Sequence, residues 1–237
     1  MRKILASVAA TLCAAFAIGT ANAATVSFSN ITGTWFDINA VEGDGVTPAT
    51  LTPTGNGTNV ATLPWGDPPP GGGPQSSYAF DGASNFMVDV PPTAQAILGT
   101  FTHNNNPIAD PGEELLSTSL RVTLDIIIDA MNLGSFSFDF DFDHNETTNT
   151  GMGCCNDIVT ITNLSELSQD FLVNGVVYTI SILGFQIGGD EFSTVEGQAN
   201  TANLLVQVSA IPLPGALTLF AAGLVGLGFA RRRRRAI

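Results

Sequence analysis

The residues best suited to chemistry are carboxylates in one acidic stretch. Between residues 135 and 143, phenylalanines alternate first with serines and then with three aspartates. Alternate residues of a strand share one face, with next-but-one neighbours about 6.5–7 Å apart. Three like charges in a row destabilise a strand unless water solvates them or a cation bridges them, and Ca²⁺ prefers six to eight oxygen ligands. The sequence therefore offers a candidate Ca²⁺ site, with a solvated acidic face as the alternative that we favour. Its candidate ligands are Asp139, Asp141, Asp143, Glu146 and Asp157.

The chain has two histidines, His103 and His144. If they meet in the fold, they can share a transition metal with a carboxylate. The alternative is structural, because Thr, His and Asn side chains often bond backbone groups that a loop leaves unpaired. The sequence favours this structural role over a metal site.

Catalytic motifs are missing from the sequence. It has no G-x-S-x-G, no H-E-x-x-H and no lysine between residues 24 and 210. Two carboxylates can make a glycosidase, but 21 acidic residues single out no pair. We therefore expect no enzymatic activity and name no catalytic residue. A sugar-binding platform of exposed aromatic residues is possible with Trp35, Trp65, Tyr78 and Tyr178.

The N-terminus has the pattern of a secretory signal peptide. Arg2 and Lys3 precede an apolar run from residue 4 to residue 18, and Ala21-Asn22-Ala23 forms an A-x-A cleavage site. Residues 1–23 are therefore expected to engage the Sec translocon and to be removed by signal peptidase.

Export permits oxidation of the adjacent Cys154 and Cys155, either as a strained vicinal disulfide or as disulfides between chains.

The C-terminal segment 211–237 has three parts in order. Pro212, Leu213 and Pro214 precede an apolar run from residue 215 to residue 230, and five arginines follow at 231–235. A helix over this run would be about 24–27 Å long, which only just spans a hydrocarbon core of about 30 Å. The arginines stay on the cytoplasmic side, which places the preceding chain outside. An ordinary membrane anchor is the alternative to a sorting signal.

This tripartite tail resembles the PEP-CTERM sorting signal of Gram-negative bacteria. The resemblance implies transient anchoring in the inner membrane and cleavage by an exosortase near the Pro motif. The chain departs from the commonest form of that motif, because Leu213 stands where glutamate is usual.

The body between the two signals, residues 24–210, is strongly acidic. It holds all 21 acidic residues of the chain and one basic residue, Arg121, which gives a net charge of −20. Such a charge repels nucleic acid and anionic lipid, so we expect neither as a partner.

Short strands with turn-rich connections predict an all-β body. The strand patterns cover residues 24–38, 78–90, 120–128, 135–143, 157–162, 171–180, 183–187 and 203–211. Residues 42–77, rich in Gly, Pro, Thr and Asn, predict a surface loop region. Asn174-Gly175 predicts a type I′ hairpin turn. We therefore expect one β-sandwich domain, jelly-roll-like, over residues 24–210.

Two short motifs in the body resemble the THxN family of PEP-CTERM proteins and the related choice-of-anchor K extracellular domain. The motif residues are Thr102, His103, Asn105, His144, Asn145, Glu146, Thr147 and Asn149. The resemblance covers about residues 35–196 and implies an exported, β-rich domain at the cell surface or in the matrix. It implies no established reaction or ligand.

These observations predict an exported, exosortase-sorted protein of the cell surface or extracellular matrix with a structural or adhesive role, in possible contact with exopolysaccharide. The alternative is a Ca²⁺-dependent or carbohydrate-binding module at the cell surface. No cofactor other than Ca²⁺ is expected.

Overall fold

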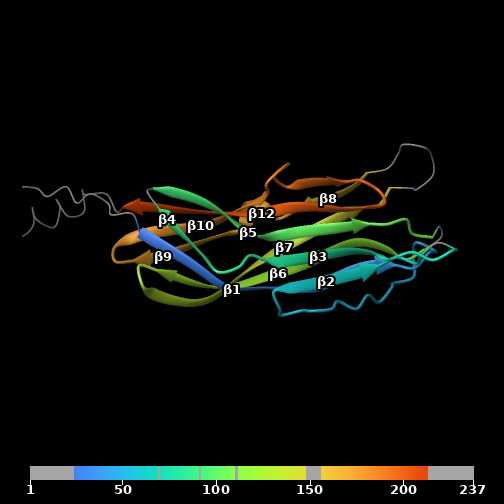
Figure 1. Cartoon of the computed structure of the whole chain (residues 1–237), viewed down its shortest axis with the longest axis horizontal. Helices are drawn as coiled ribbons and strands as arrows, with labels where there is room; N and C mark the ends of the chain where they lie inside the picture. The colour runs from blue at the N-terminus through green and yellow to red at the C-terminus, as the bar shows by residue number, and fades with distance from the viewer. Residues whose placement is uncertain (1–23, 69, 91, 110–111, 148–155, 213–237) are drawn as a thin grey trace, which may run out of the picture.

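Two antiparallel sheets of six strands each pack face to face (Figure 1). This computed structural model describes residues 24–68, 70–90, 92–109, 112–147 and 156–212. The first sheet has the order β11 (Glu191–Thr194), β8 (Asp157–Ile161), β7 (Met131–Asn145), β6 (Glu114–Ile128), β1 (Ala24–Val41), β4 (Phe86–Val90). The second has the order β2 (Val60–Trp65), β3 (Ser76–Gly82), β5 (Thr93–Asn105), β12 (Gln198–Pro212), β10 (Val176–Phe185), β9 (Ser168–Val173). A single 3₁₀ turn, η1 (Leu164–Glu166), is the only helical element in these ranges. The predicted all-β sandwich is confirmed.

Strand β7 has the alternation that its sequence predicts. Phe138, Phe140 and Phe142 are buried between the sheets, whereas Asp143 is exposed on the outer face. The strand continues to Asn145, so His144 follows the phenylalanines into the interior. The period of two that buries the aromatic rings therefore also buries a histidine.

The predicted hairpin joins β9 to β10. Asn174 and Gly175 form its turn, with φ angles of 51° and 79°. Both angles are positive, as a type I′ turn requires, and Val173 pairs with Val176 across it.

The segment 42–77, predicted as a surface loop region, contains an edge strand. Strand β2 pairs with β3, and its Trp65 is fully buried. Pro64 obscures this strand in the sequence, because proline cannot donate to a sheet ladder and is tolerated mainly on edge strands. β2 lies at the edge of its sheet, so it can accommodate Pro64.

The core between the sheets depends on close approach at two glycines. A β-carbon on Gly99 would lie 2.5 Å from the ring of Phe80, and one on Gly33 would lie 2.7 Å from the same ring. Glycine at both positions lets the ring lie flat between a strand of each sheet. Phe80 is itself fully buried.

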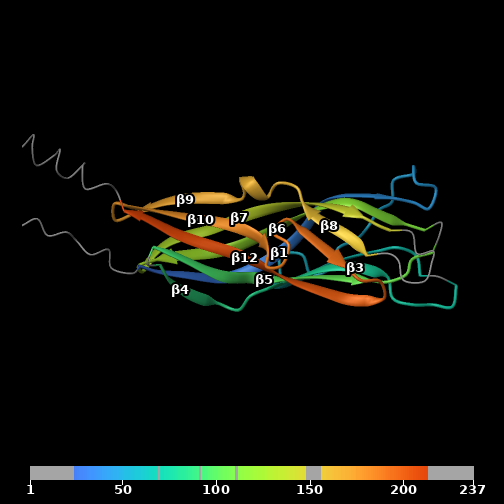
Figure 2. The ribbon, with the colours of Figure 1, turned by 90° about the horizontal axis from the view of Figure 1, so that it is seen from above.

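The two ends of the described chain lie at the same end of the sandwich (Figure 2). Ala24 pairs with Val90, and Ser209 pairs with Thr93 only three residues later. Near the opposite end of β12, Asn200 pairs with His103. Twelve residues at about 3.3 Å each place His103 about 40 Å along β12 from Pro212.

Several predicted features lie outside the described residues: the signal peptide 1–23, Asn149, Cys154, Cys155, Leu213, Pro214, the apolar run and the arginines. Of the Pro motif, Pro212 is described. It ends β12 and pairs with Val176, so the sheet extends two residues past the predicted domain end at 210. Within the ranges that are described, no helix has the length and apolar character needed to span a membrane.

Candidate functional site

Polar side chains gather inside the sandwich at the ends of four strands. β5 contributes His103 and Asn105, β7 contributes His144, β8 begins at Asp157 and β11 ends at Thr194. All five residues are buried, and four of them are completely inaccessible. Each histidine follows a buried phenylalanine by two residues, so the strand alternation itself turns it inward. We call this group, with the nearby Glu146 and Glu196, the polar cluster.

His103 is held by a hydroxyl that fixes its tautomer. Its Nδ1 lies 2.8 Å from Thr194 Oγ1, and that hydroxyl donates to the carbonyl oxygen of Asp157 at 3.2 Å. Because the hydroxyl proton is committed to the carbonyl, Oγ1 accepts from Nδ1–H. The neutral ring then presents an unprotonated Nε2, which has no hydrogen-bond partner.

His144 has partners on both ring nitrogens. The Tyr78 hydroxyl lies 2.5 Å from Nδ1, and Glu146 Oε2 lies 3.0 Å from Nε2. Burial raises the pKa of Tyr78 well above its usual range, so its hydroxyl keeps its proton and donates to Nδ1. His144 then donates Nε2–H to Glu146. It therefore orients that carboxylate and has no free lone pair to offer a metal.

Asp157 is fixed on one oxygen and unpaired on the other. Its Oδ1 accepts from the backbone N–H of Thr147 at 2.9 Å and from the Thr147 hydroxyl at 3.0 Å. Among the described residues, the buried side-chain atoms without a hydrogen-bond partner are Trp65 Nε1, His103 Nε2, Asn105 Oδ1, Glu146 Oε1, Asp157 Oδ2 and both Glu196 oxygens. Every one of them belongs to the polar cluster or to Trp65, whose indole stacks on His103 at 5.3 Å between ring centroids.

Burial dominates the electrostatics of the polar cluster. It raises the pKa of Glu146 to about 7 and that of Asp157 to about 6, and neighbouring carboxylates add to both shifts. The Trp65 indole N–H partly opposes the rise in the pKa of Glu146, although its geometry does not meet the criteria for a hydrogen bond. Burial also raises the pKa of Glu196 to about 7. It lowers the pKa of His144 to about 4 and that of His103 to about 2, so both rings are neutral at pH 7.

Two sets of possible metal ligands overlap at Asp157. Ligand atoms of His103, His144 and Asp157 lie within 4.8 Å of one another, as do those of Glu146, Asp157 and Glu196. Within the described part of the chain, no lysine or arginine side chain pairs with these carboxylates. Arg121, the only lysine or arginine between residues 24 and 212, pairs with Asp139 at 2.7 Å on the outer face of the sheet.

The five predicted Ca²⁺ ligands are not brought together. Asp139 is bound by Arg121, Asp141 accepts from Ser119 at 2.7 Å, and Asp143 is exposed. All three point away from the core, because they alternate with the buried phenylalanines. Glu146 and Asp157 instead join the polar cluster. The strand face with three aspartates therefore has the geometry of the solvated alternative.

The two family-like motifs meet across the core. Their histidine rings, one from each sheet, lie 5.2 Å apart between centroids at an angle of 84°. The proposed structural role was bonding of loop backbone, and Asn105 bonds in this way, because its side-chain amide donates to the carbonyl oxygen of Thr194. The Thr147 hydroxyl donates instead to the carboxylate of Asp157. The histidines instead bond side chains. Thr102 is half-buried and Asn145 is exposed, so neither joins the polar cluster.

The aromatic residues considered for a sugar platform face the interior. Trp35, Trp65, Tyr78 and Tyr178 are each at most 4% exposed. Their strands turn these rings between the two sheets, so they cannot stack on an external sugar. This expectation is wrong.

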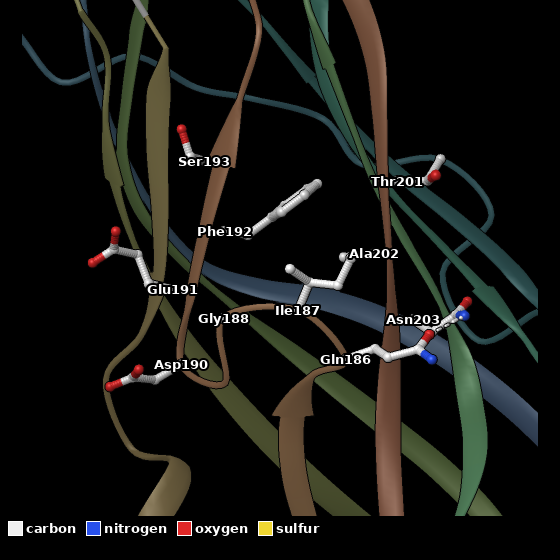
Figure 3. A pocket seen from close by; sticks show the side chains of 10 residues that line it. All are labelled: Gln186, Ile187, Gly188, Asp190, Glu191, Phe192, Ser193, Thr201, Ala202 and Asn203. Atoms are coloured by element: carbon white, nitrogen blue, oxygen red, sulfur yellow. Dashed lines mark hydrogen bonds between the residues drawn. The ribbon is translucent and has the colours of Figure 1, made fainter.

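An open cleft of about 600 Å³ lies between β11 and β12 (Figure 3). Ile187, Phe192 and Ala202 point into it, whereas Asp190 and Glu191 point away. Phe192 also packs on Phe185 in the core at 5.3 Å between ring centroids. The cleft is therefore a gap between β11, at the edge of its sheet, and β12, and it is floored by apolar side chains without converging charged groups.

The Tyr78–His144 contact gives a direct stability test. Tyr78→Phe leaves Nδ1 of the buried His144 unpaired, which should lower the free energy of unfolding by about 2 kcal/mol. Urea unfolding measures the loss. Tyr178→Phe, which removes a hydroxyl outside the polar cluster, is the matched control and should change stability by less. Equal losses in the two variants would show that the contact contributes nothing of its own.

Sequence reasoning singled out five of the seven members of the polar cluster: His103, Asn105, His144, Glu146 and Asp157. It missed Glu196 and Thr194, which had no distinguishing signal, and it did not place Tyr78 and Trp65 beside the cluster. The inward direction of His103 and Asn105 was available from the sequence, because they extend the alternation that begins at buried Phe101. No protein-family model and no curated protein sequence matches this chain.

Proposed function

We propose that the chain is an exported, non-catalytic β-sandwich protein that acts structurally or adhesively at the surface, or in the exopolysaccharide matrix, of a Gram-negative bacterium. Its signal peptide would pass through the Sec translocon, and its C-terminal segment would hold it in the inner membrane until an exosortase acts at Pro212, Leu213 and Pro214. We also propose that the strands of the sandwich are connected in a jelly-roll-like order.

The observation that carries this proposal is the polarity of the sandwich. Both ends of the described domain lie at one end, next to the segments that read as export and sorting signals (Figure 2). The polar cluster lies at the other end, about 40 Å along β12. A domain tethered in this way holds its far end away from the membrane, as a surface or matrix protein requires.

Cell fractionation tests the proposal in a host that makes an exosortase. The unmodified chain should be processed at both ends and recovered from the surface or matrix fraction. Removal of residues 213–237 should shift it to the soluble exported fraction. This truncation keeps β12 complete, because the strand ends at Pro212. A host lacking exosortase is the matched control and should retain the chain in the inner membrane, cut at its N-terminus but not at its C-terminus.

Two results would overturn the proposal. The first is intact protein in the cytosol with both termini uncut. The second is an unchanged distribution after removal of residues 213–237, because a sorting signal cannot be dispensable for sorting.

A cation-dependent module at the cell surface is the second candidate. The observation that favours it is the polar cluster, in which buried carboxylate oxygens lack a hydrogen-bond partner and form no ion pair with a lysine or arginine of the described residues. A carbohydrate-binding version has less support, because the aromatic rings are internal.

A further inference from the structure

Seven buried polar atoms lack a partner among the described residues, and they converge on one place. Isolated unpaired groups occur in folded proteins, but each costs about 1–3 kcal/mol, and more for charged groups. A cluster of them, on five different strands or strand ends, indicates that something is bound there. The chemistry of the unpaired atoms identifies its class.

We propose that His103, Glu146, Asp157 and Glu196 bind one divalent transition-metal cation, of the Zn²⁺ or Mn²⁺ type, inside the end of the sandwich farthest from the chain termini. This site depends on the folded domain alone and not on where the protein resides. Its test can therefore fail while the export proposal stands, and the reverse is also true.

The imidazole of His103 is prepared as a ligand. Thr194 holds Nδ1–H, which leaves the Nε2 lone pair free, and a ring nitrogen of His103 lies within 4.8 Å of a carboxylate oxygen of Asp157. Metal-bound histidines usually donate their other ring N–H to an oxygen in this way. The residue is also fully buried, so no water competes for Nε2 at the protein surface.

The carboxylates of Asp157 and Glu146 are likewise each held by a hydrogen bond to one oxygen, with the other oxygen left free to bind a metal. Thr147 holds Asp157 Oδ1 and leaves Oδ2 free, and His144 holds Glu146 Oε2 and leaves Oε1 free. Both oxygens of Glu196 are unpaired. Each acid therefore offers at least one oxygen without breaking any hydrogen bond described above. His144 is a positioning residue, because both of its nitrogens are already engaged.

The spacing of the ligand atoms suits a small cation. Atoms from Glu146, Asp157 and Glu196 lie within 4.8 Å of one another, and His103 lies within the same limit of Asp157. In a tetrahedral Zn²⁺ site with metal–ligand distances of about 2.0–2.2 Å, the ligand atoms lie about 3.3–3.6 Å from one another. Small side-chain rotations can therefore bring the four groups to one ion.

The donor set favours a transition metal over Ca²⁺. Ca²⁺ takes six to eight oxygen ligands, whereas imidazole nitrogen is typical of Zn²⁺ and its neighbours. One nitrogen with three carboxylates suits Zn²⁺ or Mn²⁺. A dication would also offset the negative charge of three carboxyl groups with buried oxygens, with which no lysine or arginine of the described residues pairs.

Metal binding to the full-length chain, purified in detergent and stripped with EDTA, tests the proposal. Titration with Zn²⁺, Mn²⁺, Ca²⁺ and Mg²⁺ is followed by calorimetry and by the melting temperature. We expect one Zn²⁺ or Mn²⁺ per chain and a rise in melting temperature of about 5 °C or more at saturation. Ca²⁺ and Mg²⁺ should bind at least ten-fold more weakly.

Three variants locate the ion. Glu196→Gln, at the partly exposed side of the site, should weaken binding ten-fold or more while the fold persists. Asp143→Asn, on the outer face of β7, should leave binding unchanged. Joint replacement Cys154→Ser and Cys155→Ser should also leave it unchanged, which separates this site from thiol capture of Zn²⁺.

Four results would overturn the proposal. The first is the absence of stoichiometric Zn²⁺ or Mn²⁺ binding, and the second is equal metal affinity of Glu196→Gln and Asp143→Asn. The third is loss of metal binding when both cysteines are replaced. The fourth is Ca²⁺ binding as tight as Zn²⁺ binding. In the first case the polar cluster is a network of protonated carboxyls that needs no ion.

Discussion

Replacing Trp35 by alanine is expected to lower the free energy of unfolding by about 4 kcal/mol, the usual range for loss of a large buried aromatic side chain. Trp35 is 2% exposed and lies on β1, but its indole N–H donates to the carbonyl oxygen of Ala61 on β2 at 3.1 Å. Its ring therefore joins the two sheets by a hydrogen bond as well as by packing. It also lies about 6 Å from Tyr78 and Phe142 between centroids.

Urea unfolding of the purified protein measures this loss as a lower midpoint at unchanged slope. Trp35→Phe keeps most of the packing but removes the indole donor, so a loss of about 2 kcal/mol is expected. Met87→Ala, at a side chain 72% exposed on β4, is the control and should change stability by less than about 0.5 kcal/mol. Similar losses for Trp35→Ala and Met87→Ala would contradict the assigned role of Trp35.

The sandwich could be predicted because most of its strands show a period of two in their sequences. Alternation in β7 and the Asn174-Gly175 turn identify local structure without reference to partners. β2 could not be identified, because Pro64 and a Gly- and Pro-rich context hide it. Its burial depends on pairing with β3, which is a tertiary contact.

The polar cluster was predictable only in part. His103 and His144 continue the alternation of Phe101 and Phe142, so their inward direction follows from the strand pattern. The two histidines meet only because the sheets pack with these ends of β5 and β7 facing each other. No local sequence pattern encodes this packing. Glu196 is one of 21 acidic residues, and only the pairing of β11 with β8 brings it near Asp157.

The aspartates of β7 show why residue type alone misleads. Their spacing suits Ca²⁺ ligands on one face, but that face is the outer side of the sheet. There Arg121, Ser119 and water can satisfy them. Unpaired carboxylates in the interior are a stronger indication of a cation, because burial removes the solvent that would otherwise stabilise their charge.

The second large effect is expected at Glu146 in protein stripped of metal. Burial, and then the charge of Glu114, raise the pKa of this carboxyl from 4.5 to about 7. A carboxyl with a raised pKa contributes stability below about pH 4.5, and this contribution is lost as the pH rises to about 7. Above pH 7 the ionised group lowers the free energy of unfolding by up to about 3 kcal/mol.

Glu146→Gln removes this term, because glutamine stays neutral. With EDTA present, the variant should match the wild type near pH 4.5 and exceed its stability by up to about 3 kcal/mol at pH 8. The other titratable groups facing Glu146 are present in both proteins, so their contributions largely cancel in the difference. They are Tyr78, His103, Glu114, His144, Asp157 and Glu196.

Urea unfolding at several pH values, with and without saturating Zn²⁺, measures the difference between Glu146→Gln and the wild type. Zn²⁺ should reverse its sign at pH 8, because only the wild type keeps the full set of carboxylate ligands. Asp143→Asn, at an exposed residue of β7 three positions before Glu146, should track the wild type in both conditions. A difference that is independent of pH in EDTA would contradict the buried charge assigned to Glu146.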